Sequence, residues 1–244
     1  MSHNRAKLVE SETDILREVV MAFDPGWLQP VLKRTLGPLS RRIWDIDIIG
    51  ESNIPSSGPA LIAPNHIAFI DSIFMAVLLE REAVGVGKAE YMDSWRTRYL
   101  LPAVGMIPLD RSGGEASEGA MGQADEILAA GRLFVVFPEG TRSRDGHLHR
   151  GHTGAARLAL KARCPIIPVG ISGTDAIQPV DKVLPKTGVR AEIRIGKPIS
   201  TEPYVDSTTE RGALLRQITD EVMTEISGLS GQTYVDWYFG EEPS

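Results

Sequence analysis

Short apolar runs alternate with amphipathic stretches from Ile46 onward, and this alternation strongly limits the folds open to the chain. Strands are predicted at Ile46–Ile49, Ala60–Ala63, Ala83–Gly87, Met106–Leu109, Leu133–Phe137, Ile166–Ile171 and Val189–Ile195. Helices are predicted at about Ser72–Glu80, Trp95–Leu101, Glu118–Ala130, Gly154–Ala162 and Glu210–Ile226. Strands that alternate with helices favour a mixed, mostly parallel sheet covered by helices on both faces. The predicted fold class is therefore α/β.

Size and composition fit one domain of this kind. The chain has 244 residues, 42% of them hydrophobic, which is enough for one sizeable core and too few for two. Its net charge of −6 argues against nucleic acid as a partner. Because Cys164 is the only cysteine, no internal disulfide can form, which fits a reducing compartment. We expect Cys164 to be a buried, inert thiol rather than a nucleophile.

The N-terminal region has the pattern of a membrane-surface helix. A first helix is predicted at Glu12–Phe23, followed by Pro25–Trp44, which carries four basic residues and no acidic one. Leucines recur there at helical spacing and tryptophans flank the segment, as in an interfacial anchor. Against this, Pro30 and Pro38 should kink or interrupt the helix. The alternative is a helix that packs on the protein's own core.

No part of the sequence predicts a membrane-spanning helix. Met1–Ser11 is polar and lacks the apolar region of a signal peptide. The longest apolar run, Ile73–Leu79, is far shorter than the roughly 18–20 residues that a spanning helix needs. We therefore expect a peripheral protein on the cytoplasmic face of a membrane. The predicted organisation is an N-terminal helical segment (1–45), an α/β domain (46–228) and a C-terminal tail (229–244).

His66 and Asp71 are candidates for a general base and the carboxylate that orients it. They are five positions apart, which on a regular helix would turn them about 140° from each other. Asp71 can therefore reach the imidazole only if His66 lies at or before the first turn of the helix that contains Asp71. In that geometry Asp71 holds one ring N–H and leaves the other nitrogen free to accept a proton. The alternative is a capping or core histidine.

Two arginines, Arg111 and Arg142, are candidates for binding an anion. Their guanidinium groups match phosphate oxygens, and one arginine rarely neutralises a phosphate dianion. The alternative is a solvated charge or an ion pair with Asp110 or Glu139. Together with the His66–Asp71 pair, these arginines favour an enzyme that activates a hydroxyl group on a phosphorylated small molecule.

Four segments carry these residues in a fixed order: Asn65–Asp71, Gly105–Arg111, Phe137–Ser143 and Ile167–Ile171. They resemble the four signature blocks of the glycerolipid acyltransferases, the family of 1-acylglycerol-3-phosphate acyltransferase. The resemblance covers the catalytic core and leaves both ends of the chain uncovered.

The resemblance implies a role for each segment. His66 and Asp71 would be catalytic, and the segments with Arg111 and Arg142 would bind the acceptor's glycerol phosphate group. Lys88 resembles a further phosphate contact. The residues Glu139, Gly140 and Thr141 would belong to the acceptor site, although Glu139 has a second interpretation, in which it only braces a turn. The segment at Ile167 would lie near the acyl donor, and its structural alternative is a buried strand.

Other kinds of site find little support in the sequence. His147, His149 and His152 lie in a polar segment, but no cluster of cysteines or carboxylates completes a metal ligand set there. Neither a dinucleotide fingerprint nor a phosphate-binding P-loop sequence occurs. The Gly-x-Ser-x-Gly motif of serine hydrolases is also absent.

The resemblance thus implies transfer of a fatty acyl group from an acyl thioester to lysophosphatidate, giving phosphatidate. Glycerol 3-phosphate or another lysophospholipid is the alternative acceptor, and coenzyme A or acyl carrier protein could carry the donor. No cofactor is implied beyond acyl-coenzyme A as co-substrate. A thioesterase and a non-catalytic lipid-binding membrane protein are alternatives from other classes.

Overall fold

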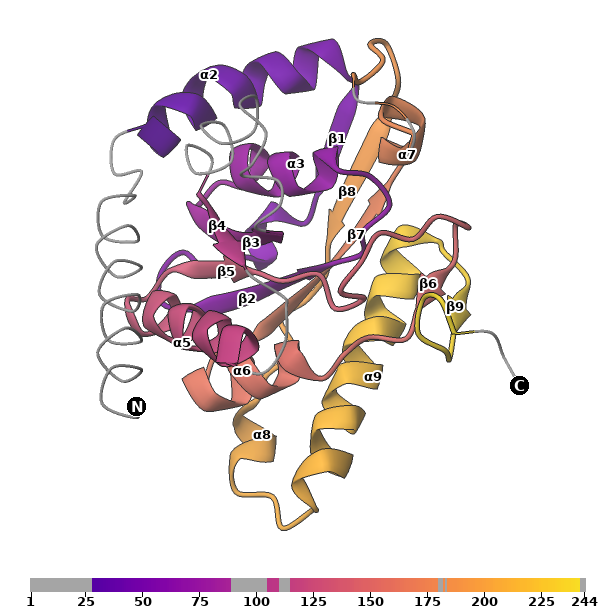
Figure 1. Cartoon of the computed structure of the whole chain (residues 1–244). Helices are drawn as coiled ribbons and strands as arrows, with labels where there is room; N and C mark the ends of the chain where they lie inside the picture. The colour runs from indigo at the N-terminus through magenta and orange to yellow at the C-terminus, as the bar shows by residue number, and fades with distance from the viewer. Residues whose placement is uncertain (1–27, 89–104, 110–114, 180–181, 183, 242–244) are drawn as a thin grey trace, which may run out of the picture.

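A seven-stranded sheet forms the centre of the computed structural model, which describes residues 28–88, 105–109, 115–179, 182 and 184–241 (Figure 1). Only the β7–β8 pair of this sheet is antiparallel. The prediction of a mixed, mostly parallel sheet is therefore confirmed. Across the sheet the strands are β1 (Ile46–Ile49), β8 (Ala191–Ile195), β7 (Ile166–Ser172), β2 (Ala60–Pro64), β5 (Leu133–Val135), β3 (Ala83–Lys88) and β4 (Met106–Leu109).

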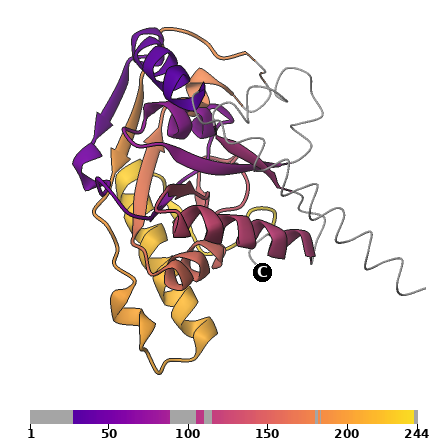
Figure 2. The same cartoon turned by 90° about the vertical axis from the view of Figure 1, so that its left-hand side faces the viewer.

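Helices cover both faces of this sheet, as Figures 1 and 2 show. The central strand β2 is buried on both sides, so its side chains alternate between two cores. Ala60 and Ile62 join one hydrophobic cluster, and Leu61 and Ala63 join the other. The first cluster lies under α2 (Leu28–Ile43) and α3 (Ile70–Leu78), and the second under α5 (Glu115–Ala129), α6 (Gly154–Ala162) and α9 (Arg211–Ser230).

Most predicted elements agree with the structure to within a few residues. The strand predicted at Leu133–Phe137 is shorter and ends at Val135, although the Val136 N–H still donates to the Ile62 carbonyl oxygen of β2 at 3.0 Å. The strand predicted from Val189 begins at Ala191, and α9 extends four residues beyond its predicted end. The helices predicted at Glu12–Phe23 and Trp95–Leu101 lie outside the described residues.

Five short elements were not predicted, because none is long enough to show a period. They are η1 (Glu51–Asn53), β6 (Leu148–His149), α7 (Thr174–Ile177), α8 (Glu202–Val205) and β9 (Tyr234–Val235). β6 and β9 pair with each other in a two-stranded sheet beside the end of α9. The C-terminal tail is thereby attached to the loop that follows β5.

Pro30 and Pro38 were expected to kink or interrupt the N-terminal helix; the interruption was wrong, because α2 contains both prolines. Pro30 lies in the first turn, where a backbone N–H has no partner within the helix. Packing supports the rest of α2: Leu32 and Leu36 lie against the core, and the buried Gln29 side chain donates a hydrogen bond to the carbonyl oxygen of Ala83 at 2.9 Å.

The inner face of α2 thus covers the protein's own core, while its outer face is exposed. Val31 is 44% exposed and Leu39 is 49% exposed, and Arg34 and Arg42 are exposed on the same side. None of the helices in the described ranges combines the length and apolar character that crossing a bilayer requires.

Candidate active site

The candidate active site lies at the carboxyl edge of the parallel strands. β2 and β5 are parallel neighbours, so the loops that follow them leave the sheet at the same edge. The first loop carries His66 and the second carries Glu139 and Arg142. Although more than 70 residues separate His66 from Glu139, the backbone N–H of His66 donates to Glu139 Oε1 at 3.1 Å.

His66 and Asp71 form the pair that their spacing predicted. His66 precedes α3, Asp71 lies in its first turn, and His66 Nδ1 is 3.0 Å from Asp71 Oδ2. The Asp71 side chain is fully buried, whereas the His66 side chain is 15% exposed. The imidazole is therefore held from inside the protein and can still be reached from outside.

One oxygen of Asp71 contacts several groups of the loop that carries the histidine. Besides facing His66 Nδ1, Asp71 Oδ2 accepts hydrogen bonds from the backbone N–H groups of Ile67 and Ala68, each at 2.8 Å. Three groups thus converge on one oxygen, which fixes both the loop and the ring. When His66 Nδ1 carries the proton, Nε2 is left as the basic nitrogen.

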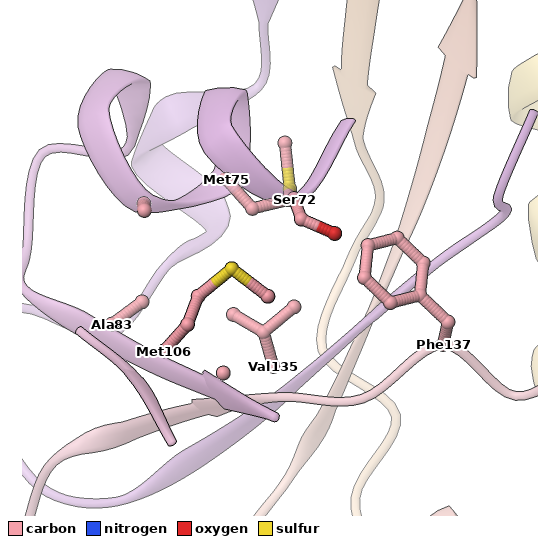
Figure 3. A pocket seen from close by; sticks show the side chains of 8 residues that line it. Ser72, Met75, Ala83, Met106, Val135 and Phe137 are labelled. Carbon is pink, nitrogen blue, oxygen red and sulfur yellow. The ribbon is translucent and has the colours of Figure 1, made fainter. Parts of the chain in front are cut away.

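An apolar pocket adjoins the histidine. Phe137 stacks on the His66 ring with centroids 4.0 Å apart, and the same phenyl group lines the pocket. Figure 3 shows the phenyl ring of Phe137 opposite Met75 and Met106, with Val135 between them. The lining combines α3 with strands β3, β4 and β5: Ser72, Met75, Ala76, Ala83, Gly85, Met106, Val135 and Phe137. Such a lining suits a hydrocarbon.

Glu139 braces the two loops. Its side chain is buried, and while Oε1 accepts the His66 N–H, Oε2 accepts the backbone N–H of His149 at 3.1 Å. Burial raises the pKa of Glu139 to about 7; the two N–H donors oppose this rise, and the nearby carboxylates of Asp71 and Asp145 add to it. Both oxygens already have backbone partners, so the arrangement favours the bracing interpretation over contact with the acceptor.

Gly140, Thr141 and Arg142 follow Glu139 directly, at the edge of the site. Gly140 has φ 69°, and a Cβ added there would lie 3.0 Å from His152 Cδ2, so both conformation and space favour glycine. Thr141 and Arg142 are half-buried. Among the described residues Arg142 has no carboxylate partner, and Glu139, its suggested partner, is occupied by backbone groups.

The structure describes the other predicted site residues only in part. Lys88 is the last residue of β3, and its Cα pairs with that of Leu109 at the same edge of the sheet. Arg111 lies outside the described residues. The segment at Ile167 is part of β7, where Ile167 and Val169 are fully buried. The phosphate-binding roles of Arg111, Arg142 and Lys88 remain predictions.

Two other predictions concern sites of different chemistry. Cys164 is buried, and burial raises the pKa of its thiol to about 11, so the prediction of a buried thiol is confirmed. Within the described ranges no three His, Cys, Asp or Glu side chains gather as a metal site would require. His149 is instead buried and faces Asp145, and the His152 ring stacks on Tyr238 with centroids 4.6 Å apart.

Sequence reasoning missed three residues at the site. Phe137 was assigned to a strand and to the third signature segment, and Asn65 to the first, but neither was given a role. Gln232 lies 167 positions from its hydrogen-bonding partner Asn65, and no local pattern marks such a contact. For Asn65 a signal did exist, because a carboxamide that directly follows a buried strand needs hydrogen-bonding partners.

Comparison with known proteins identifies the class to which this fold and site belong. The sequence model of the acyltransferase family matches residues 45–172, a range that contains the His66–Asp71 pair and Arg142. The chain belongs to the acyltransferase family. Its fold is similar to the crystal structure of the 1-acyl-sn-glycerophosphate (LPA) acyltransferase from Thermotoga maritima, with a TM-score of 0.62 and 24% identity, covering 87% of this chain and 82% of that one.

Several similar proteins are named 1-acyl-sn-glycerol-3-phosphate acyltransferases. The chain is 31% identical over 159 residues to a chloroplastic 1-acyl-sn-glycerol-3-phosphate acyltransferase of Arabidopsis thaliana, covering 64% of this chain and 44% of that protein. It is 25% identical over 185 residues to the 1-acyl-sn-glycerol-3-phosphate acyltransferase of Borreliella burgdorferi, covering 74% and 71%. The chain spans half or less of the length of the similar enzymes from Arabidopsis thaliana, Brassica napus and Limnanthes douglasii.

Proposed function

We propose that the protein transfers a fatty acyl group from an acyl thioester to the free hydroxyl of lysophosphatidate, giving phosphatidate. The observation that carries this proposal is the His66–Asp71 pair beside an apolar pocket. A base next to a hydrocarbon site suits a reaction between a hydroxyl group and a lipid acyl group. Relatives named 1-acyl-sn-glycerol-3-phosphate acyltransferases support lysophosphatidate as the acceptor.

The base activates the acceptor hydroxyl. A hydroxyl is too weak an acid to attack a thioester unaided at neutral pH, and a positioned base contributes about 10²–10⁴-fold. His66 Nε2 takes the hydroxyl proton while the oxygen attacks the thioester carbonyl. Asp71 holds Nδ1–H and stabilises the imidazolium that forms. Collapse of the tetrahedral intermediate breaks the C–S bond, and the proton on His66 can pass to the departing thiolate.

The two substrates approach from different parts of the site. The acyl chain would lie against the pocket between α3 and the sheet, because seven of its eight lining residues offer only apolar side chains or glycine. Arg142, with Arg111 and Lys88, would hold the acceptor phosphate. Fixing both reactants turns a bimolecular encounter into an oriented attack.

The outer face of α2 would attach the enzyme peripherally to the membrane that holds its lipid substrate. Val31 and Leu39 are exposed there beside Arg34 and Arg42. Apolar side chains flanked by cations match an anionic lipid surface. A location on the cytoplasmic side of that membrane belongs to the same proposal.

An acceptor series tests the proposal. Thiol release and lipid products are followed with palmitoyl-coenzyme A and lysophosphatidate, glycerol 3-phosphate or no acceptor, and the series is repeated with palmitoyl-acyl carrier protein. We expect release that depends on lysophosphatidate and matches the phosphatidate formed. Release without acceptor would identify a thioesterase instead, and a preference for glycerol 3-phosphate would overturn the assigned acceptor.

Arg142→Ala extends this test to the phosphate site. We expect the KM for lysophosphatidate to rise about tenfold or more, because an arginine–phosphate contact is lost. Arg144→Ala, two residues away and exposed, is the matched control and should behave as the unmodified protein. Equal KM values for both variants would remove Arg142 from the acceptor site.

A further inference from the structure

The residue before the catalytic histidine is tied to two distant parts of the chain. The Asn65 side chain is fully buried. Its Oδ1 accepts the Ile171 N–H at 2.6 Å, and its Nδ2 donates to the Ile171 carbonyl oxygen at 2.8 Å. Nδ2 also donates to Gln232 Oε1 at 2.7 Å. The backbone that leads into His66 is thus attached both to β7 and to the C-terminal tail.

Gln232 connects Asn65 to the loop that carries Arg142. While its Oε1 accepts from Asn65, its Nε2 donates to the carbonyl oxygen of Gly146 at 3.0 Å. Its backbone is held as well, because Ser227 Oγ donates to its carbonyl oxygen at 2.8 Å and its N–H donates to Ser230 Oγ at 3.2 Å. The carboxamide is therefore a fixed bridge between two loops.

The tail that follows Gln232 lies along this second loop. β9 pairs with β6, and the Leu148 N–H donates to the Thr233 carbonyl oxygen at 3.0 Å. Further along, the Arg150 N–H donates to the Trp237 carbonyl oxygen at 3.0 Å. Figure 1 shows β6 and β9 side by side near the end of α9. The loop is thus held on its outer side by the tail.

The same loop contacts His66 directly. The Ser143 N–H donates to the His66 carbonyl oxygen at 2.8 Å, and Glu139 accepts the His66 N–H. With the Gln232 bridge, these contacts join the loop 139–149 to the backbone of His66 and the side chain of Asn65 at three points. Two of them involve groups of the loop itself, and the third depends on one side chain from outside it.

We propose that Gln232 is a positioning residue, which fixes the loop carrying Arg142 relative to His66. This inference rests on the proposed acyl transfer, because it assigns Gln232 the task of holding the acceptor site in line with the base. The hydrogen bonds of the Gln232 side chain go to Asn65 and Gly146, so removing it should leave the His66–Asp71 pair in place. Its loss should misplace the acceptor hydroxyl while leaving the base intact.

Kinetics of Gln232→Ala test this assignment, with Gln217→Ala on the exposed side of α9 as the matched control. We expect acceptor-dependent transfer to fall about 10- to 100-fold, since small misplacements of reactants have effects of this size. The ratio of free fatty acid to phosphatidate should rise, because water can reach the intact base where the acceptor is misplaced. The apparent pKa values in the pH profile of kcat/KM should not move.

The ratio of products separates positioning from simple loss of folded protein, which lowers both products equally. An unchanged ratio in Gln232→Ala would therefore overturn the inference, whatever the total rate. Gln232→Glu separates the two ends of the bridge: it keeps an acceptor for Asn65 and loses the donor to Gly146. It should resemble Gln232→Ala, and activity equal to that of the unmodified protein would show that the Gly146 contact is dispensable.

A measurement without substrates separates this inference from the proposed function. Backbone amide hydrogen exchange should become faster in residues 139–149 of Gln232→Ala and stay unchanged in Gln217→Ala. If the unmodified protein makes no phosphatidate, the proposed function fails, whether or not exchange changes. If it makes phosphatidate and exchange in 139–149 is the same in both variants, the positioning role fails alone.

Discussion

At the scale of single residues, Asp71 Oδ2 organises the candidate site. It faces the imidazole and accepts two backbone N–H groups from the loop between His66 and α3. The helix start and the histidine are therefore oriented together. This explains how a five-residue spacing, which would separate the two side chains on a regular helix, brings them to 3.0 Å.

Asp71→Asn tests the electrostatic part of this arrangement. An amide oxygen can still accept the backbone N–H groups, so the fold should be retained. The negative charge that stabilises the imidazolium is lost, and we expect kcat to fall about 10³–10⁴-fold. Thiol release and thermal unfolding are measured together, with the exposed Asp175→Asn as control. A loss below tenfold would contradict the assigned role.

Glu139 should make stability depend on pH. Burial raises its pKa from 4.5 to about 7, so between these values the native state holds a proton that the unfolded state has lost. The stabilisation that this proton gives the native state is fully present below about pH 4.5 and is lost as pH rises through about 7. Between pH 5 and 7.5 the loss amounts to roughly 2 kcal/mol.

Glu139→Gln removes this titration. Denaturant unfolding is measured at pH 5 and 7.5. Over this range the free energy of unfolding of the unmodified protein should fall by roughly 2 kcal/mol more than that of the variant. If the two proteins lose equal stability over this range, Glu139 does not have the raised pKa.

At the scale of elements, α9 and β7 approach so closely that one position requires glycine. A Cβ at Gly170 would lie 2.4 Å from the backbone of Leu229 and Ser230, near the end of α9. Gly170→Ala should therefore destabilise the protein by about 1–3 kcal/mol. Gly228→Ala, at an exposed position of α9 with no neighbour within 4 Å, should be neutral or stabilising. Equal unfolding midpoints would argue against this packing.

The outer face of α2 gives a second prediction at this scale. Deletion of the whole helix would not test this face, because Leu32 and Leu36 on the inner face of α2 pack on the core. Arg34→Glu with Arg42→Glu should instead weaken binding to vesicles containing anionic phospholipid about tenfold or more.

The control for this prediction carries the same change of charge elsewhere. Arg157→Glu with Arg211→Glu alters exposed positions on α6 and α9, which cover the other face of the sheet. Vesicle binding of this variant should stay near that of the unmodified protein. If both double variants bind equally, net charge rather than α2 governs the attachment.

At the scale of the whole molecule, local patterns in the sequence predicted the sheet and the His66–Asp71 pair. Strand and helix periods reflect burial on one or two faces, and the pair depends on residues within one loop and helix start. The mistaken interruption of α2 came from judging Pro30 and Pro38 by backbone chemistry alone, while packing on α3 and the sheet supports the helix.

Contacts between distant segments could not be predicted in this way. The preference of Glu139 for backbone N–H groups depends on how the loops after β2 and β5 meet. The bridge from Gln232 to Asn65 and Gly146 depends on where α9 ends beside β7. Neither contact leaves a periodic or local signature in the sequence, because each is fixed only when the strands assemble.

The most direct test of the central claim, that His66 is the base of an acyl transfer, compares His66→Ala with His147→Ala. His147 is exposed, so its variant controls for the loss of a histidine. Phosphatidate formation from palmitoyl-coenzyme A and lysophosphatidate is measured beside thermal unfolding. We predict that His66→Ala lowers the rate of phosphatidate formation at least about 10²-fold while its unfolding temperature is unchanged. His147→Ala should leave the rate unchanged. Comparable rates for both variants would contradict the account.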